Sequence, residues 1–462
     1  MTAAPDAPAI PAVVHVVKGR AVTDATEPFP GFTAPALDLD DLIWLRSEPG
    51  PAFDTPIADV IDFLEAVGKA LDYDSNPLLQ EALEQTLACS TLDRRILENL
   101  YRGIPFFFHR AVLEFQVEQE LGFDAIDGWS TIEHPHGRDV RVRAFPPRLA
   151  HVLAGNTPAV AVTTIVRGAL SKGVHLLKLP ANDLFTASAI LRTMIAIDPD
   201  HPTTRSFSAV YWRGGDTSVE SAIMRAQYFD KLVVWGGDVA VRNALRYAAP
   251  GFEIVSFDPK ESASMVGREA HVSEATVLDA ADRAANDATL FNQDACAASR
   301  YVYVEGTVEE VDTFCAALAD AVKQERMTAA AVARPLPHEI RDEIDVLSTL
   351  EPLYRVWGDA SGAGLIIRSE DPVDFYPMSK TVNVVHVSDL KDAVRFTNVA
   401  TQTVGIYPRT RIPELRDDLA NHGVQRITAL GEVATHVDGL PHDGFYPLRR
   451  VMRWTLDDAA QS

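Results

Sequence analysis

Cys296 is the residue of this sequence best suited to covalent chemistry. It lies in the stretch LFNQDACAASRYVYVE, residues 290–305, where small or polar neighbours such as Ala295, Ala297 and Ser299 leave room for a substrate. A thiolate is the most nucleophilic common side chain, and a helix N-terminus or a nearby cation makes it more reactive by lowering the thiol pKa. The alternative for a single cysteine is a small buried hydrophobic residue. The choice between a nucleophile and a buried hydrophobic residue depends on the elements that position Cys296.

Upstream of Cys296, from residue 151 onward, apolar strands alternate with helical segments. Strands are predicted at residues 174–178, 208–212, 231–234 and 253–256, after a first strand that ends at residue 154. This alternation is typical of βαβ units and a parallel sheet. In such a sheet the loops after the strands meet at one edge, where ligands bind. We therefore expect Asn156, Lys178 and the pair Gly236 and Gly237 at that edge.

The rest of the chain completes an α/β fold with an open parallel-sheet domain and a second α/β domain. A second set of strands and helices is predicted between residues 300 and 420. The predicted divisions are a mostly helical N-terminal segment packing on the parallel-sheet domain (1–130), a hairpin arm (131–150), the parallel-sheet domain itself (151–285), the second α/β domain with Cys296 (286–425) and a C-terminal segment returning to the arm (426–462).

Composition excludes several classes of function. The chain has 462 residues, which predicts two to three domains, and its formal net charge of -23 argues against nucleic acid or an anionic membrane as the main partner. It contains no long uncharged apolar run and no secretory signal, so we expect a cytoplasmic protein without a membrane span.

The cysteines and histidines predict no metal site and no disulfide. Cys89, Cys296 and Cys315 are odd in number and widely spaced, without a CxxC pair. His134 and His136 lie beside a turn-prone Pro and Gly and have no third ligand nearby, so we interpret them as solvated loop residues.

Five motifs in a fixed order indicate a family. They are AGNTP (residues 154–158), Lys178-Leu179-Pro180, the glycine pair 236–237, FNQDACAASR (residues 291–300) and PHDG (residues 441–444). The set resembles the aldehyde dehydrogenase superfamily, and more closely its acyl-CoA reductase branch, typified by the fatty acid reductase of bacterial bioluminescence. The resemblance covers roughly residues 130–455. It implies an aldehyde-dehydrogenase-like fold in which residues 151–285 are the dinucleotide-binding cofactor domain and residues 286–425 the catalytic domain, with an oligomerisation arm.

The resemblance implies the catalytic roles. Cys296 would take the acyl group from a thioester and release CoA or a carrier-protein thiol, and hydride from a nicotinamide would then give an aldehyde. Asn156 and the backbone N–H of Cys296 would stabilise the oxyanions, where loss of one donor typically costs about 3–4 kcal/mol of barrier. The alternative for Asn156 is a turn residue with a local hydrogen bond.

The resemblance also implies a cofactor site, for NADPH with NADH as the alternative. Lys178 would contact the adenosine ribose or its 2′-phosphate, and Gly236 and Gly237 would let the backbone approach the pyrophosphate. Asp374 corresponds loosely to a ribose-binding acidic residue of the superfamily. A lysine at the sheet rim and a helix entry without a ligand are the alternatives, and GxGxxG is absent.

Two further residues are assigned to the lining of the substrate site. Gln293 belongs to the same motif as Cys296, and His442 belongs to PHDG. A histidine titrates near neutrality and is able to protonate a leaving thiolate. Because adjacent residues on a strand point to opposite faces, His442 and Asp443 are not expected to form a simple dyad.

One departure from the superfamily distinguishes reduction from hydrolysis. Hydrolytic aldehyde dehydrogenases carry Glu-Leu-Gly-Gly before the cysteine, and its Glu activates water. Here the corresponding segment, residues 256–262, reads SFDPKES, with Glu261 displaced by a few residues. This favours NAD(P)H-dependent reduction of an acyl thioester to an aldehyde. An aldehyde dehydrogenase forming an acid, a non-reducing acyltransferase or thioesterase, and an acyl-binding scaffold stay open.

The resemblance implies partners as well. The acyl donor would be acyl-CoA or an acyl-carrier protein, and acyl-supplying partner subunits are known for the related bioluminescence enzymes. The predicted hairpin arm and C-terminal strand resemble the arm through which the superfamily forms homodimers or homotetramers.

Overall fold

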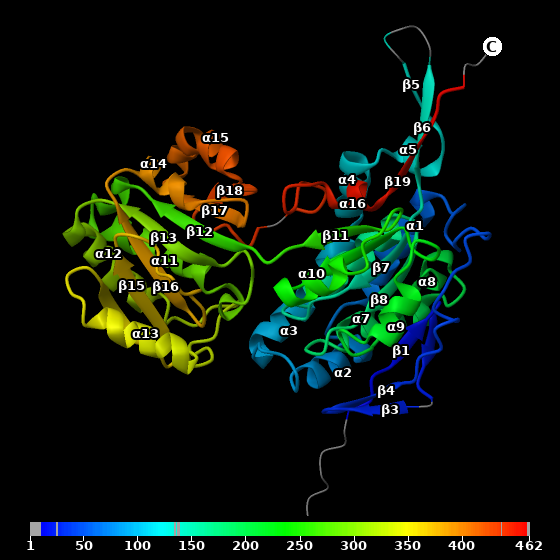
Figure 1. The fold of residues 1–462 in the computed structure, drawn as a ribbon, viewed down its shortest axis with the longest axis horizontal. Helices are drawn as coiled ribbons and strands as arrows, with labels where there is room; N and C mark the ends of the chain where they lie inside the picture. The colour runs from blue at the N-terminus through cyan, green and yellow to red at the C-terminus, as the bar shows by residue number, and fades with distance from the viewer. Residues whose placement is uncertain (1–10, 25, 134, 136–138, 436, 460–462) are drawn as a thin grey trace, which may run out of the picture. The chain divides into compact units, whose positions relative to one another are not determined.

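The computed structural model describes residues 11–24, 26–133, 135, 139–435 and 437–459. The chain divides into two compact α/β units (Figure 1). The first contains the chain up to Asp258 together with Asp438–Pro441 and the segment from Phe445 onward. The second contains Pro259–Val437 and His442–Gly444. The C-terminal chain therefore contributes to both units.

The first unit is built on a seven-stranded sheet of order β11-β10-β7-β8-β9-β1-β2. Strands β7 to β11 are parallel, as the sequence predicts, and β1 adds antiparallel to β9. The N-terminal segment thus extends the cofactor sheet. The strands are β1 His15–Val17, β2 Arg20–Val22, β7 Arg148–Val152, β8 Val174–Lys178, β9 Phe207–Val210, β10 Lys231–Trp235 and β11 Glu253–Phe257, beside a separate pair β3 Thr26–Phe29 and β4 Phe32–Pro35.

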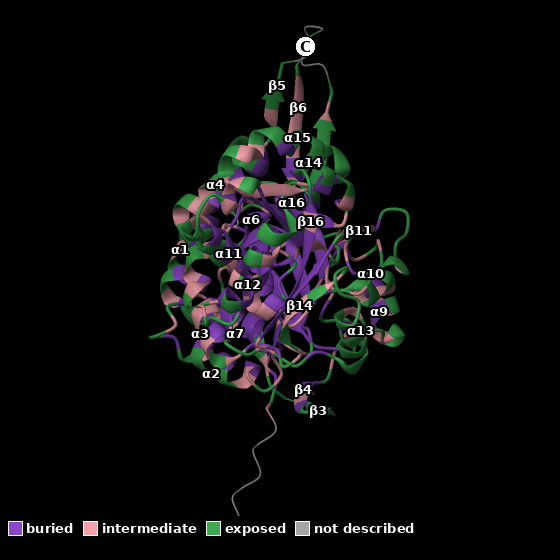
Figure 2. Cartoon of the chain, turned by 90° about the vertical axis from the view of Figure 1, so that its left-hand side faces the viewer, coloured by how far each residue is buried: buried purple, intermediate pink, exposed green. Residues whose placement is uncertain are grey.

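Helices cover this sheet because its strands are apolar on both faces. Ala150, Leu176 and Leu232 pack in a cluster with residues of α9 and α10, whereas Leu149 and Val233 face the side of α6. Figure 2 shows buried residues in purple on interior strands such as β16 of the second unit, with exposed residues in green on many of the helices. The helices are α1 Ile57–Ala70, α2 Pro77–Thr86, α3 Arg94–Gly103, η1 Ile104–Phe108, α4 Arg110–Glu120, α5 Phe123–Asp127, α6 Ala159–Leu170, α7 Thr186–Ile197, α8 Pro202–Arg205, α9 Thr217–Ile223, α10 Asp238–Leu245 and α16 Pro447–Val451.

The second unit has its own seven-stranded sheet, of order β14-β15-β16-β13-β12-β17-β18. All neighbours in it are parallel except the edge pair β14 and β15. The strands are β12 Glu261–Val266, β13 Ser299–Glu305, β14 Arg355–Asp359, β15 Gly364–Ser369, β16 Thr381–Val387, β17 Thr401–Tyr407 and β18 Arg426–Ala429. The helices are η2 Arg268–His271, α11 Glu274–Ala288, η3 Leu290–Gln293, α12 Val308–Ala321, α13 His338–Ser348, α14 Leu390–Ala393, η4 Val394–Phe396, η5 Arg409–Arg411 and α15 Ile412–His422.

Strand β13 shows how this sheet is buried on both faces. Val302 and Val304 belong to the core cluster that contains α11 and α12, and Tyr303 belongs to the opposite cluster with α14 and α15. This alternation is the two-residue period of a strand. The second unit starts earlier than residue 286, the sequence-based boundary, because β12 pairs with both β13 and β17.

A small three-stranded sheet of order β19-β6-β5 completes the first unit. The predicted hairpin forms from β5 Ser130–Ile132 and β6 Val140–Phe145, and the C-terminal strand β19 Arg453–Asp457 pairs antiparallel with β6. His134 and His136 lie outside the described residues. Among the described residues, no helix is both long and apolar enough to cross a membrane.

Candidate functional site

The loop that carries Cys296 joins α11 to β13 in the second unit and is conformationally strained. Phe291, Asn292 and Gln293 have φ values of 53°, 55° and 74°. The left-handed region costs a residue with a Cβ roughly 1–2 kcal/mol, less for Asn. Tertiary contacts hold the loop: the Phe291 N–H donates to the Thr328 carbonyl at 2.8 Å, and the Asn292 Oδ1 accepts from the Ala330 N–H at 2.8 Å. The fold therefore imposes the conformation of this loop.

Gln293 is part of this support. Its side chain is buried, and its Nε2 donates to the carbonyls of Thr381 at 2.8 Å and Ser299 at 3.4 Å. Arg300 donates from Nη2 to the Gln293 carbonyl at 2.8 Å and from Nη1 to the Pro377 carbonyl at 2.6 Å. These contacts assign Gln293 to positioning of the loop, in place of the substrate-lining role expected from its motif.

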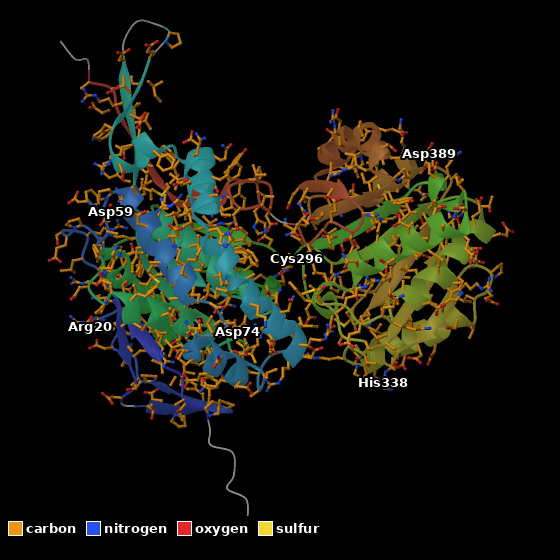
Figure 3. The ribbon with its side chains drawn as sticks, turned by 180° about the vertical axis from the view of Figure 1, so that it is seen from behind. Arg20, Asp59, Asp74, Cys296, His338 and Asp389 are labelled. Carbon is orange, nitrogen blue, oxygen red and sulfur yellow. The ribbon has the colours of Figure 1, made fainter. Side chains whose placement is uncertain are left out.

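Cys296 itself is exposed, labelled in Figure 3, and its sulfur has a hydrogen-bond donor. The Gln402 Nε2 donates to the Cys296 Sγ at 3.2 Å and to the Asp443 Oδ1 at 2.7 Å. The Cys296 carbonyl accepts from the Ser262 hydroxyl at 2.8 Å. Sequence reasoning did not find Gln402, since no motif surrounds it.

Five influences act on the Cys296 thiol. Solvent reaches the residue, yet protein atoms around the sulfur desolvate it, and this raises the pKa of the thiol. The negative charge of Asp443 raises the pKa further, whereas hydrogen bonds from the Gln402 side chain and from the backbone at Ala297 and Cys296 lower it. The net effect is a raised thiol pKa, and no cation of the described residues is among these influences.

His442 and Asp443 lie closer together than the sequence predicted. The argument against a dyad assumed a strand, but Asp443 has a φ of 51° and forms a turn with Gly444. The His442 Nε2 is therefore 3.7 Å from the Asp443 Oδ1, an ion pair when the ring is protonated. The expectation of opposite faces was wrong because the backbone turns here.

The edge of the first sheet carries the predicted cofactor residues. Lys178, the last residue of β8, is 9% exposed, and its Nζ lies 5.7 Å from the centroid of the Tyr211 ring. Burial lowers the pKa of the Lys178 ammonium, and the nearby charge of Glu220 opposes that shift. A partly desolvated cation at the end of a parallel strand is suited to bind a phosphate or ribose.

Glu220 of α9 is a buried carboxylate with four donors. Its Oε1 accepts from the Trp212 Nε1 at 3.3 Å and the Gly215 N–H at 3.0 Å. Its Oε2 accepts from the Asn243 Nδ2 at 2.9 Å and the Tyr247 hydroxyl at 3.0 Å. The network ties the loop after β9 to α10 and the residues that follow it, next to the predicted cofactor residues Gly236 and Gly237.

Gly236 and Gly237 connect β10 to α10 and leave the helix N-terminus open. Gly236 has a φ of 156°, and a Cβ there would lie 3.0 Å from the Ala240 Cβ. Gly237 is the N-cap of α10, makes no side-chain cap, and would have no atom within 4 Å of an added Cβ. Free backbone N–H groups at such a terminus favour an anion.

Asn156 and Asp374 lie in loops. Asn156 follows β7 in the turn before α6, where Gly155 packs so closely on Asn182 that a Cβ would lie 2.3 Å from its Oδ1. Asn156 belongs to the first unit and Cys296 to the second. Asp374 is exposed between β15 and β16 of the second unit. Their roles toward substrate and cofactor stay predictions.

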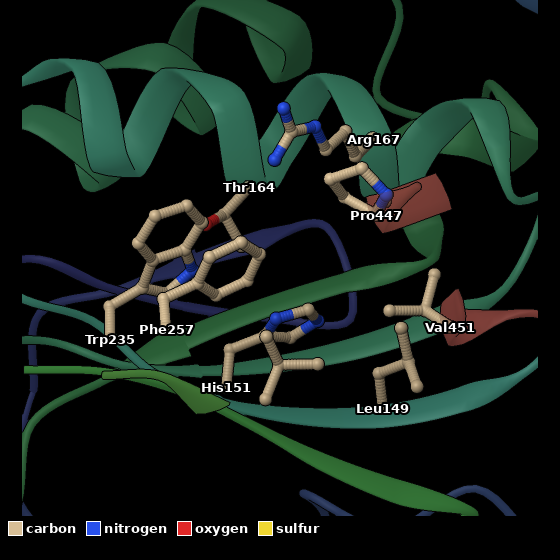
Figure 4. A pocket seen from close by; sticks show the side chains of 10 residues that line it. Leu149, His151, Thr164, Arg167, Trp235, Phe257, Pro447 and Val451 are labelled. Atoms are coloured by element: carbon tan, nitrogen blue, oxygen red, sulfur yellow. The ribbon is translucent and has the colours of Figure 1, made fainter. Parts of the chain in front are cut away.

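The first unit also contains a small pocket between its sheet, α6 and α16 (Figure 4). Its walls are mostly apolar, and Trp235 stacks on Phe257 with ring centroids 3.6 Å apart. The lining residues are Leu149, His151, Thr164, Arg167, Gly168, Val233, Trp235, Phe257, Pro447 and Val451.

A chain of buried hydrogen bonds fixes the protonation of His151 in this pocket. The Ser171 hydroxyl donates to the Gly168 carbonyl at 2.7 Å, so the His175 Nε2, 3.4 Å from that hydroxyl, must donate to it. The His175 Nδ1 then accepts from the His151 Nε2 at 3.2 Å. Burial lowers the pKa of both rings, so they are neutral. The His151 Nδ1 is an acceptor without a partner among the described residues.

Comparison with known proteins decides the family. Residues 52–454 match the family described as acyl-CoA reductase (LuxC). The chain belongs to this family. Its curated relatives include the long-chain acyl-protein thioester reductase of Vibrio harveyi, which is 28% identical over 409 residues, covering 87% of this chain and 82% of the relative. This member of the family is therefore an oxidoreductase that acts on an acyl thioester.

Solved structures confirm the aldehyde dehydrogenase-like fold of this acyl-CoA reductase. A lactaldehyde dehydrogenase matches with a TM-score of 0.71 and 14% identity, covering 97% of this chain and 99% of the other. An NADP-dependent glyceraldehyde-3-phosphate dehydrogenase from Bacillus halodurans, complexed with NADP, matches with a TM-score of 0.69 and 13% identity, covering 97% and 98%. The resemblance and fold class predicted from the motifs are confirmed.

Proposed function

We propose that this LuxC-family enzyme reduces an acyl thioester to an aldehyde through a thioacyl intermediate on Cys296. The observation that carries the assignment is an exposed cysteine on a strained loop, with a side-chain donor on its sulfur. Attack by the sulfur forms its bond to the acyl carbon and breaks the bond to the donor thiol, which leaves and takes up a proton. The C=O electron pair moves onto oxygen and returns as the thiol departs.

The dinucleotide, when bound, supplies the hydride that reduces the acyl carbon. The residues of the first unit that would hold it are Lys178, Gly236 and Gly237, with Asp374 of the second unit as a weaker candidate. The open N-terminus of α10 fits a pyrophosphate, and the buried ammonium of Lys178 fits a ribose 2′-phosphate. We propose NADPH as the cofactor, with NADH as the alternative.

The segment where hydrolytic relatives carry their water-activating Glu supports transfer to a thiol over hydrolysis. Phe257 at the end of β11 stacks on Trp235. Glu261 begins β12, with its backbone N–H bound to the Ala400 carbonyl, and burial raises the pKa of its carboxyl while the charge of Arg300 lowers it. Glu261 is thus held on a strand a few residues beyond the place of that Glu, and this displacement is what favours reduction over hydrolysis.

The test is thioester-dependent oxidation of NADPH or NADH, followed by absorbance with a panel of acyl-CoAs and acyl-carrier proteins. Cys296→Ala should abolish it, and Cys89→Ala, which changes a cysteine near α2 whose thiol pKa burial raises to about 11, should not. Free thiol released without cofactor oxidation would instead show acyl transfer or hydrolysis. Equal activity in Cys296→Ala would refute the nucleophile.

Partners and location follow as proposals. The relatives act on acyl-protein thioesters by name, so an acyl-carrier partner is the favoured donor, with acyl-CoA and acyl-supplying subunits to be tested beside it. The sheet of β5, β6 and β19 is the proposed surface for a homodimer or homotetramer. The free cysteines Cys89, Cys296 and Cys315 support a reducing, cytoplasmic location.

A further inference from the structure

The amide of Gln402 joins the proposed nucleophile to a buried carboxylate. We infer that Gln402 is a catalytic residue whose N–H stabilises the Cys296 thiolate, and that Asp443 is the positioning residue that holds the amide in place. The inference rests on the proposed role of Cys296 as the acyl acceptor. It adds two residues that the motifs of the sequence did not assign.

Chemistry fixes the orientation of the amide. An ionised carboxylate only accepts hydrogen bonds, so the group 2.7 Å from the Asp443 Oδ1 must be the Nε2 of Gln402. The same nitrogen lies 3.2 Å from the Cys296 Sγ. With one N–H on the carboxylate, the other points to the sulfur, which accepts. Gln402 therefore favours the thiolate over the thiol.

Both supporting side chains are held rigidly. Gln402 is 6% exposed and lies on β17, which pairs with β12 and β18 on its two sides. The Asp443 side chain is 5% exposed, in the segment 442–444 that belongs to the second unit. An amide fixed at both ends loses little conformational freedom when charge develops on the sulfur, which is the requirement for electrostatic stabilisation.

The charged and titratable groups around the sulfur act in opposite directions. Asp443 disfavours the thiolate through its charge, while Gln402 favours it. His442 faces Asp443 at 3.7 Å, and its protonation would offset that charge. Tyr376 is also near enough for the charge of Cys296 to affect it. Asp443 thus has two separable effects, because its oxygen orients the amide and its charge opposes the thiolate.

The reaction uses the donor twice. When the sulfur bonds to the acyl carbon it loses its charge, and the amide is released from a strong hydrogen bond. When the reduced intermediate collapses, the bond from carbon to the Cys296 sulfur breaks, its electron pair returns to sulfur, and the Gln402 N–H receives the thiolate again. Removing the donor should therefore slow release of the aldehyde as well as attack.

The experiment is the pH dependence of iodoacetamide alkylation at Cys296, read by mass spectrometry of its peptide in the full chain. Gln402→Leu should move the profile to higher pH and slow alkylation at pH 7 about tenfold, the loss expected for one charge-assisted donor. Asp443→Asn keeps an oxygen for the amide and removes the charge, so its profile should move to lower pH. Gln324→Leu, an exposed position on the second unit, is the matched control.

The outcomes are separable. If the Gln402→Leu profile overlies that of the unchanged protein, or Asp443→Asn moves the profile to higher pH, the inference is overturned. Asp443→Asn serves alone if Gln402→Leu does not fold, as judged by circular dichroism. A different observation would refute the proposed function. It is thioester-dependent cofactor oxidation that persists in Cys296→Ala, whatever the alkylation profiles show.

Discussion

Replacing Glu220 with Gln should destabilise the first unit and weaken its cofactor site. The carboxylate accepts four hydrogen bonds, two at each oxygen, and is 2% exposed. A glutamine of the same shape has only one acceptor oxygen. Its NH₂ group would face either Trp212 and Gly215, which only donate, or Asn243 and the Tyr247 hydroxyl, which is also able to accept. At least one hydrogen bond is lost in the better orientation and two in the other.

The cost follows from the lost bond. A hydrogen bond to a charged group contributes about 1.5–3 kcal/mol, so in the better orientation the unfolding free energy falls by at least that amount. For a unit of this size a change of 1 kcal/mol shifts Tm by about 2–4 °C, which predicts a decrease of about 5–10 °C. The variant also loses the charge that keeps the Lys178 pKa from falling further, so NADPH should bind more weakly.

Calorimetry would measure Tm, and titration with NADPH would measure Kd. Glu118→Gln is the matched control, since Glu118 is exposed on α4, and its Tm should stay within about 2 °C, as for surface substitutions generally. A Tm for Glu220→Gln that equals the control would refute the assignment of Glu220 as a saturated buried carboxylate. If Tm falls while NADPH affinity is unchanged, the hydrogen bonds around Glu220 stabilise the fold but do not contribute to cofactor binding.

Two further changes test other parts of the molecule. Lys178→Met should raise KM for NADPH about tenfold, with a smaller rise for NADH and little change in kcat. The reason is that it removes binding to the 2′-phosphate that is equally strong in the ground state and the transition state. Equal effects on both cofactors in steady-state assays would count against a phosphate contact. Burial raises the pKa of Asp287 to about 7, although Gly431 and Val433 donate to it. The folded protein therefore holds a proton that the unfolded chain releases, and unfolding free energy should fall by about 2 kcal/mol between pH 5 and 8. Asp287→Asn should remove that dependence in urea titrations, and an unaltered pH slope would contradict it.

Much of the fold follows from local patterns. Alternating apolar strands and helices predicted the parallel sheet. Val60, Phe63 and Val67 have the spacing of one helical face, and all three are buried in α1. Asp183 accepts from the N–H of Thr186, the first residue of α7, at 3.1 Å. These features depend on residues that are close together in the sequence, so a single sequence is enough to predict them.

The contacts around the sulfur depend on distant residues instead. Gln402 and Asp443 are separated by 41 positions, and Gln402 and Cys296 by 106. Gln402 belongs to no motif, and a glutamine on a strand has no sequence signal that marks it as a donor. Asp443 lies in the PHDG motif, but the motif alone did not predict the turn there. The unit boundary was placed too late for the same reason, since β12 is assigned by its pairing partners rather than by its own residues.

Because β19 pairs with β6, the three-stranded sheet forms only after the C-terminal strand has been synthesised. Arg453 pairs with Phe145, so the last strand emerges from the ribosome about 300 residues after its partner, roughly 15–60 s later at ordinary rates of synthesis. Until then one edge of the β5–β6 hairpin has unpaired backbone groups, a template for association with another chain. Nascent chains on one messenger are therefore most vulnerable to mispairing at Val140–Phe145, and chains truncated before residue 453 would keep that edge open permanently.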